Sequence, residues 1–322
     1  MRPFVRPARQ RGVAVITALL LTALAITVVA SLFWQQQVQV RSMENQRLRL
    51  QTQWAMRGMV DFARFWLRQD NPSLTALDGV WATPIEEARL DDYVDREKVD
   101  TEKFDATVSG RALDAQARFN ITNLATATGI VSQPYVQAYQ RLLSNLQLDS
   151  SLAQATADAV LRARPKPRSA GNDGKAPAAS AATGGGSEPV AFTQIEDLLA
   201  VPGYTPQIIE KLRDFIIVLP ELTPVNVNTA PAEVLAAVTM LSLSEASALT
   251  LSNPRKKFVD KLNFQNNINA ALIEGIELDV KSRYFLTVIR VRLDRAALDA
   301  VALVNRKTDP QRTTSLVWLR EN

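Results

Sequence analysis

An uncharged apolar segment near the N-terminus constrains this chain more than any other feature, because it brings lipid into the folding problem. No Asp, Glu, Lys or Arg occurs between Gly12 and Arg41. The residues from Val13 to Trp34 are predominantly apolar. As a helix this stretch is about 33 Å long, and a hydrocarbon core is about 30 Å thick. The segment therefore predicts one transmembrane helix.

The charges before this segment predict its orientation. Four arginines precede it: Arg2, Arg6, Arg9 and Arg11. The positive-inside rule then keeps the N-terminus in the cytoplasm and places the bulk of the chain outside. A cleaved signal peptide is the alternative, with a shorter apolar core and a small-x-small cleavage site. The run ends in Leu32-Phe33-Trp34, which does not suit signal peptidase, so an uncleaved span is favoured.

The helix is expected to continue beyond the membrane. Residues 35–68 contain no proline and one glycine, Gly58, and good helix formers dominate. Ala55, Met59, Phe62 and Trp66 are spaced as one helix face, and the Asp-Asn-Pro-Ser sequence at 70–73 breaks the pattern. One helix of about 55 residues is predicted, with its outer half packed on a folded domain.

The start of the chain resembles the leader of type IV pilins and type II secretion pseudopilins. The resemblance rests on Arg11-Gly12 followed by a long apolar helix. It implies that a cytoplasm-facing prepilin peptidase cuts between Gly12 and Val13 and methylates the new N-terminus. Most family members carry glutamate at the fifth position, where this chain has Thr17. That absence is similar to the K-type minor pseudopilin, and an unpaired carboxylate in lipid is costly.

Composition argues against an enzyme. The chain has no cysteine and no histidine, so thiol chemistry and the commonest general base and metal ligand are missing. No Gly-x-Ser-x-Gly or phosphate-cradling glycine motif is present. The net charge is +4, and the four leader arginines account for all of it. The excess positive charge is therefore a topology signal rather than a nucleic-acid footprint.

The region after the long helix predicts irregular surface followed by a hairpin. Residues 71–103 are rich in Pro, Asp and Glu around Trp81-Ala82-Thr83-Pro84, and no EF-hand pattern accompanies the acids. Seven acids in this zone read as a solvated face: Asp91, Asp92, Asp95, Glu97, Asp100, Glu102 and Asp105. Residues 106–111 and 115–121 show partial alternation, so a hairpin with its turn at 112–114 is predicted.

A helical block follows. The sequence Arg-Phe-Asn-Ile-Thr-Asn-Leu at 118–124 resembles a K-type segment, and its asparagines are interpreted as structural. Helices are predicted at 135–146 and 149–163, and a disordered loop at 164–189. Calcium binding is known in some K-type members. Their acidic stretch corresponds here to residues 159–164, where arginines replace the acids, so no cofactor or metal ligand is predicted.

Residues 192–216 resemble a helix-hairpin-helix, a fold that binds DNA phosphates in other proteins. Thr193 and Glu196 are predicted to form a capping box, and Thr205 with Pro206 to begin the next helix. The turn between the helices is Pro-Gly-Tyr-Thr-Pro, and proline offers no N–H to a phosphate. DNA binding is therefore the weaker interpretation.

The sequence Val-Asn-Val-Asn-Thr-Ala-Pro-Ala-Glu-Val-Leu at 225–235 resembles the signature of the K-type helical domain. Asn228 or Thr229 is expected to cap its helix. Alternating residues at 283–293, 297–305 and 313–319 predict a terminal strand meander. The predicted fold class is α+β: the long helix on a small antiparallel sheet, with an inserted all-helical domain. The expected divisions are 1–12 leader, 13–34 membrane span, 35–70 outer half-helix, 71–124 first part of the α/β domain, 125–280 helical insertion and 281–322 last strands.

The resemblance implies a K-type minor pseudopilin at the tip of a type II secretion pseudopilus, single-pass in the bacterial inner membrane with its bulk in the periplasm. It implies assembly with I-type and J-type minor pseudopilins through a helix stripe at 38–67, processing by prepilin peptidase, and no nucleic-acid or small-molecule substrate. Two alternatives remain: a membrane-anchored DNA-binding protein of uptake type, and a generic signal-anchored periplasmic interaction protein.

Overall fold

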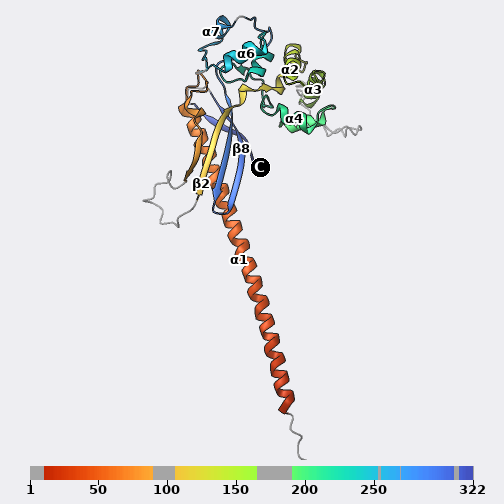
Figure 1. Cartoon of the computed structure of the whole chain (residues 1–322), viewed down its shortest axis with the longest axis vertical. Coiled ribbons are helices and arrows are strands. Elements are labelled where there is room, and N and C mark those ends of the chain that lie inside the picture. The colour runs from red at the N-terminus through yellow and green to blue at the C-terminus, as the bar shows by residue number, and fades with distance from the viewer. Residues whose placement is uncertain are drawn as a thin grey trace, which may run out of the picture.

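The computed structural model describes residues 11–89, 106–164, 191–252, 255–268, 270–307 and 312–321. Its longest element is α1, Arg11–Gln69, a continuous helix of 59 residues, as the absence of helix breakers predicted. Figure 1 shows that the N-terminal half of α1 projects away from the folded body, while its C-terminal half lies along the sheet. The helix ends at Asp70-Asn71-Pro72, where proline cannot continue the hydrogen-bond ladder.

One antiparallel sheet of five strands packs against α1. The strands are β1 (Ile85–Arg89), β2 (Ala106–Asp114), β7 (Tyr284–Leu293), β8 (Ala296–Arg306) and β9 (Thr314–Glu321), in the order β1-β2-β7-β8-β9. The helix lies mainly over β7 and β8. Met56, Met59, Ile289 and Val291 share the core between helix and sheet. The three predicted C-terminal strands are confirmed.

The predicted hairpin at 106–121 is wrong. Residues 106–114 form one strand that pairs along its whole length with β7, a strand about 175 residues later in the chain. The side chain of Asp114 then accepts a hydrogen bond from the Gln116 amide and turns the chain into the 3-10 helix η4, Ala115–Ala117. Local alternation did not reveal that the pairing partner of β2 is distant in sequence.

The helical part lies between β2 and β7 in sequence and, in Figure 1, at the end of the body away from the N-terminus of α1. Its core is one cluster of buried apolar side chains that includes Phe119, Tyr139 and Leu142, so this core begins before the predicted boundary at 125. Its helices are α2 (Gln133–Asn145), α3 (Leu152–Ala163), η5 (Ile121–Leu124), η6 (Ile195–Ala200), α4 (Pro206–Leu212), α5 (Ala232–Val238), α6 (Leu243–Thr250) and α7 (Lys261–Asn267).

Two short parallel strand pairs complete the helical part. Strand β3 (Phe119–Asn120) pairs with β4 (Ile216–Ile217), and β5 (Val225–Asn226) pairs with β6 (Leu278–Asp279). The first pair therefore closes the segment 119–217 and the second pair closes the segment 225–279. The predicted helices at 135–146 and 149–163 are confirmed as α2 and α3, with boundaries shifted by up to three residues.

The described part of the region after α1, residues 71–89, is mostly exposed, as its composition suggested, but it contains a buried tryptophan. Trp81, in the 3-10 helix η1 (Val80–Ala82), is only 2% exposed and packs edge-on against Phe285 at 5.2 Å between ring centroids. Leu67 and Val304 complete this buried cluster. The seven acids at 91–105 lie outside the described residues, as does all but Arg164 of the predicted disordered loop.

Two predicted helix caps are shifted. Gln194, rather than Thr193, caps η6, and Asp197 rather than Glu196 accepts the returning backbone bonds. Helix α5 begins after Pro231, because the side chains of Asn228 and Thr229 bind other parts of the fold. The predicted cap of α4 is confirmed, since the hydroxyl of Thr205 accepts from the Ile208 amide.

Candidate assembly site

The N-terminal end of α1 presents an apolar surface. Its most apolar window has a mean hydropathy of 2.7 and none of that window is buried in the folded body, so this helix is long and apolar enough to cross a membrane. The backbone of Gly12 is helical, and Val13 is 63% exposed. The segment therefore has its contacts outside this chain, in lipid or in a neighbouring subunit.

The hydroxyl of Thr17 is satisfied within the helix. Its Oγ1 lies 3.0 Å from the carbonyl oxygens of both Val13 and Ala14. Thr22 and Thr27 donate in the same way to carbonyls three residues earlier. A hydroxyl in lipid is costly when unbonded, and this back-bonding removes the cost. Thr17 thus needs no hydrogen-bond partner from outside the helix.

The outer half of α1 has two different faces. The face on the sheet buries Thr52, Met56, Met59, Val60 and Leu67. Of the predicted stripe, Met59 is buried, whereas Ala55, Phe62 and Trp66 are only half-buried at its flanks. The prediction found the correct side of the helix, but its centre is rotated by about one residue, because the sheet covers a broader arc than a single stripe.

The opposite face of α1 carries a second apolar stripe, which we call the outward stripe: Met43, Leu50, Trp54 and Phe65. These side chains are between 46% and 68% exposed, and Trp54 is the most exposed of them. At 100° per residue the outward stripe lies about half a turn from the sheet-facing residues. Arg57 stacks on Trp54 at 5.4 Å, which keeps the indole ordered on the surface. A solvent-facing helix side has no need of this apolar content, so it indicates a partner.

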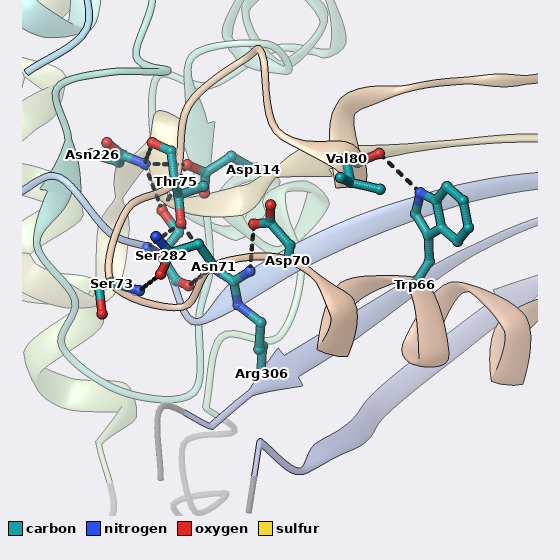
Figure 2. A network of polar contacts seen from close by, with 10 residues as sticks. All are labelled: Trp66, Asp70, Asn71, Ser73, Thr75, Val80, Asp114, Asn226, Ser282 and Arg306. Carbon is teal, nitrogen blue, oxygen red and sulfur yellow. Dashed lines mark hydrogen bonds and ion pairs between the residues drawn. The ribbon is translucent and has the colours of Figure 1, made fainter. Parts of the chain in front are cut away.

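A buried polar junction joins the helical part to the sheet (Figure 2). The carboxylate of Asp114, at the end of β2, accepts from Asn226 at 2.8 Å, from Ser282 at 2.6 Å and from Thr229 at 2.6 Å. Its other oxygen accepts from the Gln116 amide at 2.8 Å. The donors lie in three segments: Gln116 just after β2, Asn226 with Thr229, and Ser282 just before β7. Asp114 therefore links the chain where it leaves the sheet to the chain where it returns.

An ion pair extends this junction to α1. Arg306, at the end of β8, donates to Asp70 at 2.9 Å and to Thr75 Oγ1 at 2.8 Å, and both charged side chains are buried. Its guanidinium also lies over the ring of Phe285, 4.6 Å from the centroid. Because the end of α1, the following loop and β8 all meet at Arg306, the long helix and the helical part share one rigid support.

Burial raises the pKa of the Asp114 carboxyl above its usual value, and the hydrogen bonds that Asp114 accepts oppose this shift. The junction was not predicted from the sequence. The alternation of β8 was the available signal: Ala300, Ala302 and Val304 are buried, and Arg306 continues their side of the strand. A charge at an inward position predicts a buried partner.

The asparagines in the segments 118–124 and 225–235, which resemble K-type sequences, have a structural role, as predicted. Asn120 and Asn123 are buried and bind the segment 219–223 through both amide groups and backbone atoms. Asn228 both donates to the Phe258 carbonyl and accepts from its amide. These side chains replace backbone pairing where the helical part has loops.

The residues at 159–164 do not fit a cation site. The Arg164 guanidinium donates to the carbonyl oxygens of Thr122 and Thr126, so a positive side chain already uses these acceptors. Among the residues that the structure describes, no group of three or more His, Cys, Asp or Glu side chains is placed to hold a metal. In the region that resembles a helix-hairpin-helix, Arg213 is paired with both Glu196 and Glu210.

Comparisons with known proteins agree with this architecture. Two family models described as Type II secretion system (T2SS), protein K match residues 117–221 and 225–283, together just over half of the chain. The type II secretion system protein K of Pseudomonas aeruginosa is 27% identical over 326 aligned positions, covering 93% of this chain and 90% of that protein. The protein K of Aeromonas hydrophila is 25% identical, covering 91% and 92%.

A solved structure has the same fold. It is a chain in the crystal structure of the GspK-GspI-GspJ complex from the enterotoxigenic Escherichia coli type 2 secretion system. The two chains superpose with a TM-score of 0.66 at 18% identity, over 87% of this chain and 99% of that chain. The two chains therefore share their fold over most of this chain. The chain belongs to the type II secretion system protein K family, the K-type minor pseudopilins.

Proposed function

We propose that this minor pseudopilin sits at the tip of the pseudopilus and initiates or caps its assembly, with the outward stripe of α1 as the surface that binds I-type and J-type subunits. The observation that carries the proposal is the exposed apolar stripe opposite the sheet. A helix needs one apolar face to pack on its own domain, and the second face indicates neighbouring helices. The solved relative is a complex with GspI and GspJ, which supports partners of this kind.

The position at the tip follows from shape. The helical part lies at the end of the body away from the N-terminus of α1 (Figure 1). A subunit added above this one would have to occupy the space of the helical part. The buried junction around Asp114 and Arg306 holds that part in place, so it obstructs further addition as a rigid body. The role is structural and needs no catalytic group.

The membrane topology belongs to the same proposal. The four leader arginines place the N-terminus in the cytoplasm and the sheet and helical part in the periplasm. Prepilin peptidase then removes residues 1–12, and Val13 becomes the methylated N-terminus. Thr17 replaces the usual glutamate because a subunit at the tip has no neighbour above it whose amine would pair with a carboxylate.

Two matched substitutions test the stripe. Trp54 and Leu262 are both 68% exposed, but only Trp54 lies on the outward stripe. When the full chain is co-purified with I-type and J-type subunits, Trp54→Ala should reduce the recovered complex at least tenfold, as expected of an aromatic anchor in an interface. Leu262→Ala should leave recovery unchanged. Equal recovery of both variants would contradict the assignment of the interface to the stripe.

A further inference from the structure

The two edge strands of the sheet, β1 and β9, differ in the features that protect an edge from pairing with another strand. Strand β1 is five residues long, three of them charged, and its register with β2 is interrupted by an irregularity. Strand β9 is eight residues long, and its centre from Ser315 to Leu319 carries no charge. Leu316 and Val317 are about 40% exposed. Charges, bulges and short length normally protect an edge from pairing. Strand β9 has a register irregularity of its own, at Val317, but its centre has neither charge nor short length.

The hydrogen-bond pattern shows which groups of β9 are open. The amide of Arg306 donates toward β7, to the Arg283 carbonyl, and the amide of Lys307 donates toward β9, to Thr313. Successive residues of an antiparallel strand face alternate neighbours, and the register shift at Val317 moves this alternation by one residue. Ser315, Trp318 and Arg320 therefore bond to β8. The backbone groups of Thr314, Leu316, Leu319 and Glu321 then point to the open edge.

One contact supports this assignment. Arg64 of α1 donates at 2.8 Å to the carbonyl oxygen of Thr314, the first outward group. For Leu316 and Leu319, no backbone partner on that side occurs within the part of the chain that the structure describes. The edge is thus capped by a side chain at its start and open along its centre, where another strand can pair.

The direction of β9 restricts its partner. The strand begins beside Arg64 and ends at Glu321, which shares a groove with Asn45 and Arg49. It therefore runs toward the membrane, opposite to α1. An antiparallel partner must run away from the membrane, as β2 and β8 do in this chain. A second copy in the same membrane is excluded, because the two-fold axis of an antiparallel β9–β9 pair would invert one α1.

We infer that β9 pairs with an extended strand of a neighbouring pseudopilin anchored in the same membrane, which extends the sheet across the subunit boundary. The inference rests on the proposed function, because the neighbour is an I-type or J-type subunit. Arg320, stacked on Trp318 at 4.1 Å, and the exposed Arg312 flank the open centre, and neither pairs with a carboxylate among the described residues. The partner segment should therefore carry alternating apolar residues and acidic residues near its ends.

Hydrogen exchange tests the pairing directly. The full chain is compared alone and in the purified complex with I-type and J-type subunits, with mass spectrometry of peptides that cover 314–321. Exchange of these amides should slow at least tenfold in the complex. A complex with unchanged exchange would overturn the inference and leave the proposed function intact. Failure of the wild-type subunits to form a complex would overturn both.

A pair of substitutions at one position separates backbone from side chain. Leu316→Pro removes an outward N–H without removing a bond to β8, whereas Leu316→Ala keeps the N–H and removes the side chain. Leu316→Pro should reduce recovery of the complex at least tenfold, and Leu316→Ala by less than threefold. Equal effects would contradict strand pairing. Hydrogen exchange in β7 and β8 that matches the wild type would show that the proline variant is folded. If this variant does not fold, the comparison of the wild-type chain alone and in the complex decides.

Discussion

The helical part and its junction with the sheet are held together by different kinds of contact. Inside the helical part, side chains such as Phe119, Tyr139 and Leu142 are completely buried in one largely apolar cluster. At the junction, Asp114, Asn226 and Arg306 are equally buried but are joined by hydrogen bonds. Apolar contact depends on area and accepts small rotations, whereas hydrogen bonds depend on distance and angle. The junction therefore fixes how one part sits on the other.

The largest expected effect is at the buried ion pair. Arg306→Ala leaves the buried carboxylate of Asp70 without its cation, so the free energy of unfolding should fall by about 3–5 kcal/mol. Urea unfolding of the full chain in detergent, followed by circular dichroism, measures this change. Leu142→Met, a volume-conserving change in the apolar core, should cost less than about 1.5 kcal/mol. Equal costs would contradict the difference between core and junction.

Removing both members of the pair sharpens the same comparison. The double variant Asp70→Leu/Arg306→Met buries no charge, so it should recover most of the stability that Arg306→Ala loses. The same urea titration provides the value. A double variant as unstable as Arg306→Ala would show that the hydrogen bonds of Arg306 to Thr75 and Ser282, and not the charge of Asp70, dominate.

Asp114→Asn should lower the free energy of unfolding by about 1–3 kcal/mol, because an amide cannot accept at both of its ends. Whichever way the new amide turns, its N–H₂ group meets the Gln116 amide or the three donors on the other side. The midpoint of urea unfolding measures the loss. A variant as stable as the wild type would mean that the junction tolerates an unpaired donor.

The difference in unfolding free energy between the wild type and Asp114→Asn should change with pH in a defined direction. The pKa of Asp114 is raised by burial, so the folded state holds its proton to higher pH than the unfolded state does. The contribution of Asp114 is therefore fully present below the unfolded-state pKa, about 4, and declines as pH rises through the folded-state pKa. The advantage of wild type over Asp114→Asn should shrink as pH rises above about 4. An advantage that grows would show that the hydrogen bonds lower the pKa.

Alanine substitutions at two glycines should have effects of opposite sign. A Cβ at Gly79 would lie 2.7 Å from the Trp81 ring and 3.1 Å from the Ala76 carbonyl oxygen, so Gly79→Ala should cost about 1–3 kcal/mol. A Cβ at Gly58 in α1 would meet nothing within 4 Å, so Gly58→Ala should stabilise by about 0.5–1 kcal/mol. Thermal unfolding of both variants checks the pair, and a stabilising Gly79→Ala would contradict the packing of Trp81.

The sequence predicted the elements whose signals are local. The long helix α1, the helices α2 and α3, and the last three strands were all readable from periodicity and breakers. The predicted hairpin and the predicted surface position of Trp81 were wrong because the contacts of these residues are distant in sequence. Strand β2 pairs with β7, and Trp81 packs on Phe285. The junction was missed for the same reason, since the side-chain donors to Asp114 follow it by 112 to 168 residues.

The residues of the candidate site also differ in whether a local sequence signal reveals them. Thr17 and the outward stripe lie on one helix, so their spacing is visible in the sequence, although the stripe that faces outward was not separated from the one that faces the sheet. Gly12 and Val13 remain predictions, because cleavage depends on a peptidase and not on the fold.

The central claim is that this chain is processed and assembled as a pseudopilin, and the mass of its N-terminus tests that claim most directly. The full chain is expressed with and without a prepilin peptidase, and the N-terminal peptide is measured by mass spectrometry. We expect a peptidase-dependent start at Val13 that carries one methyl group. An intact Met1 in the presence of the peptidase, or a start near residue 30 or beyond, would contradict it.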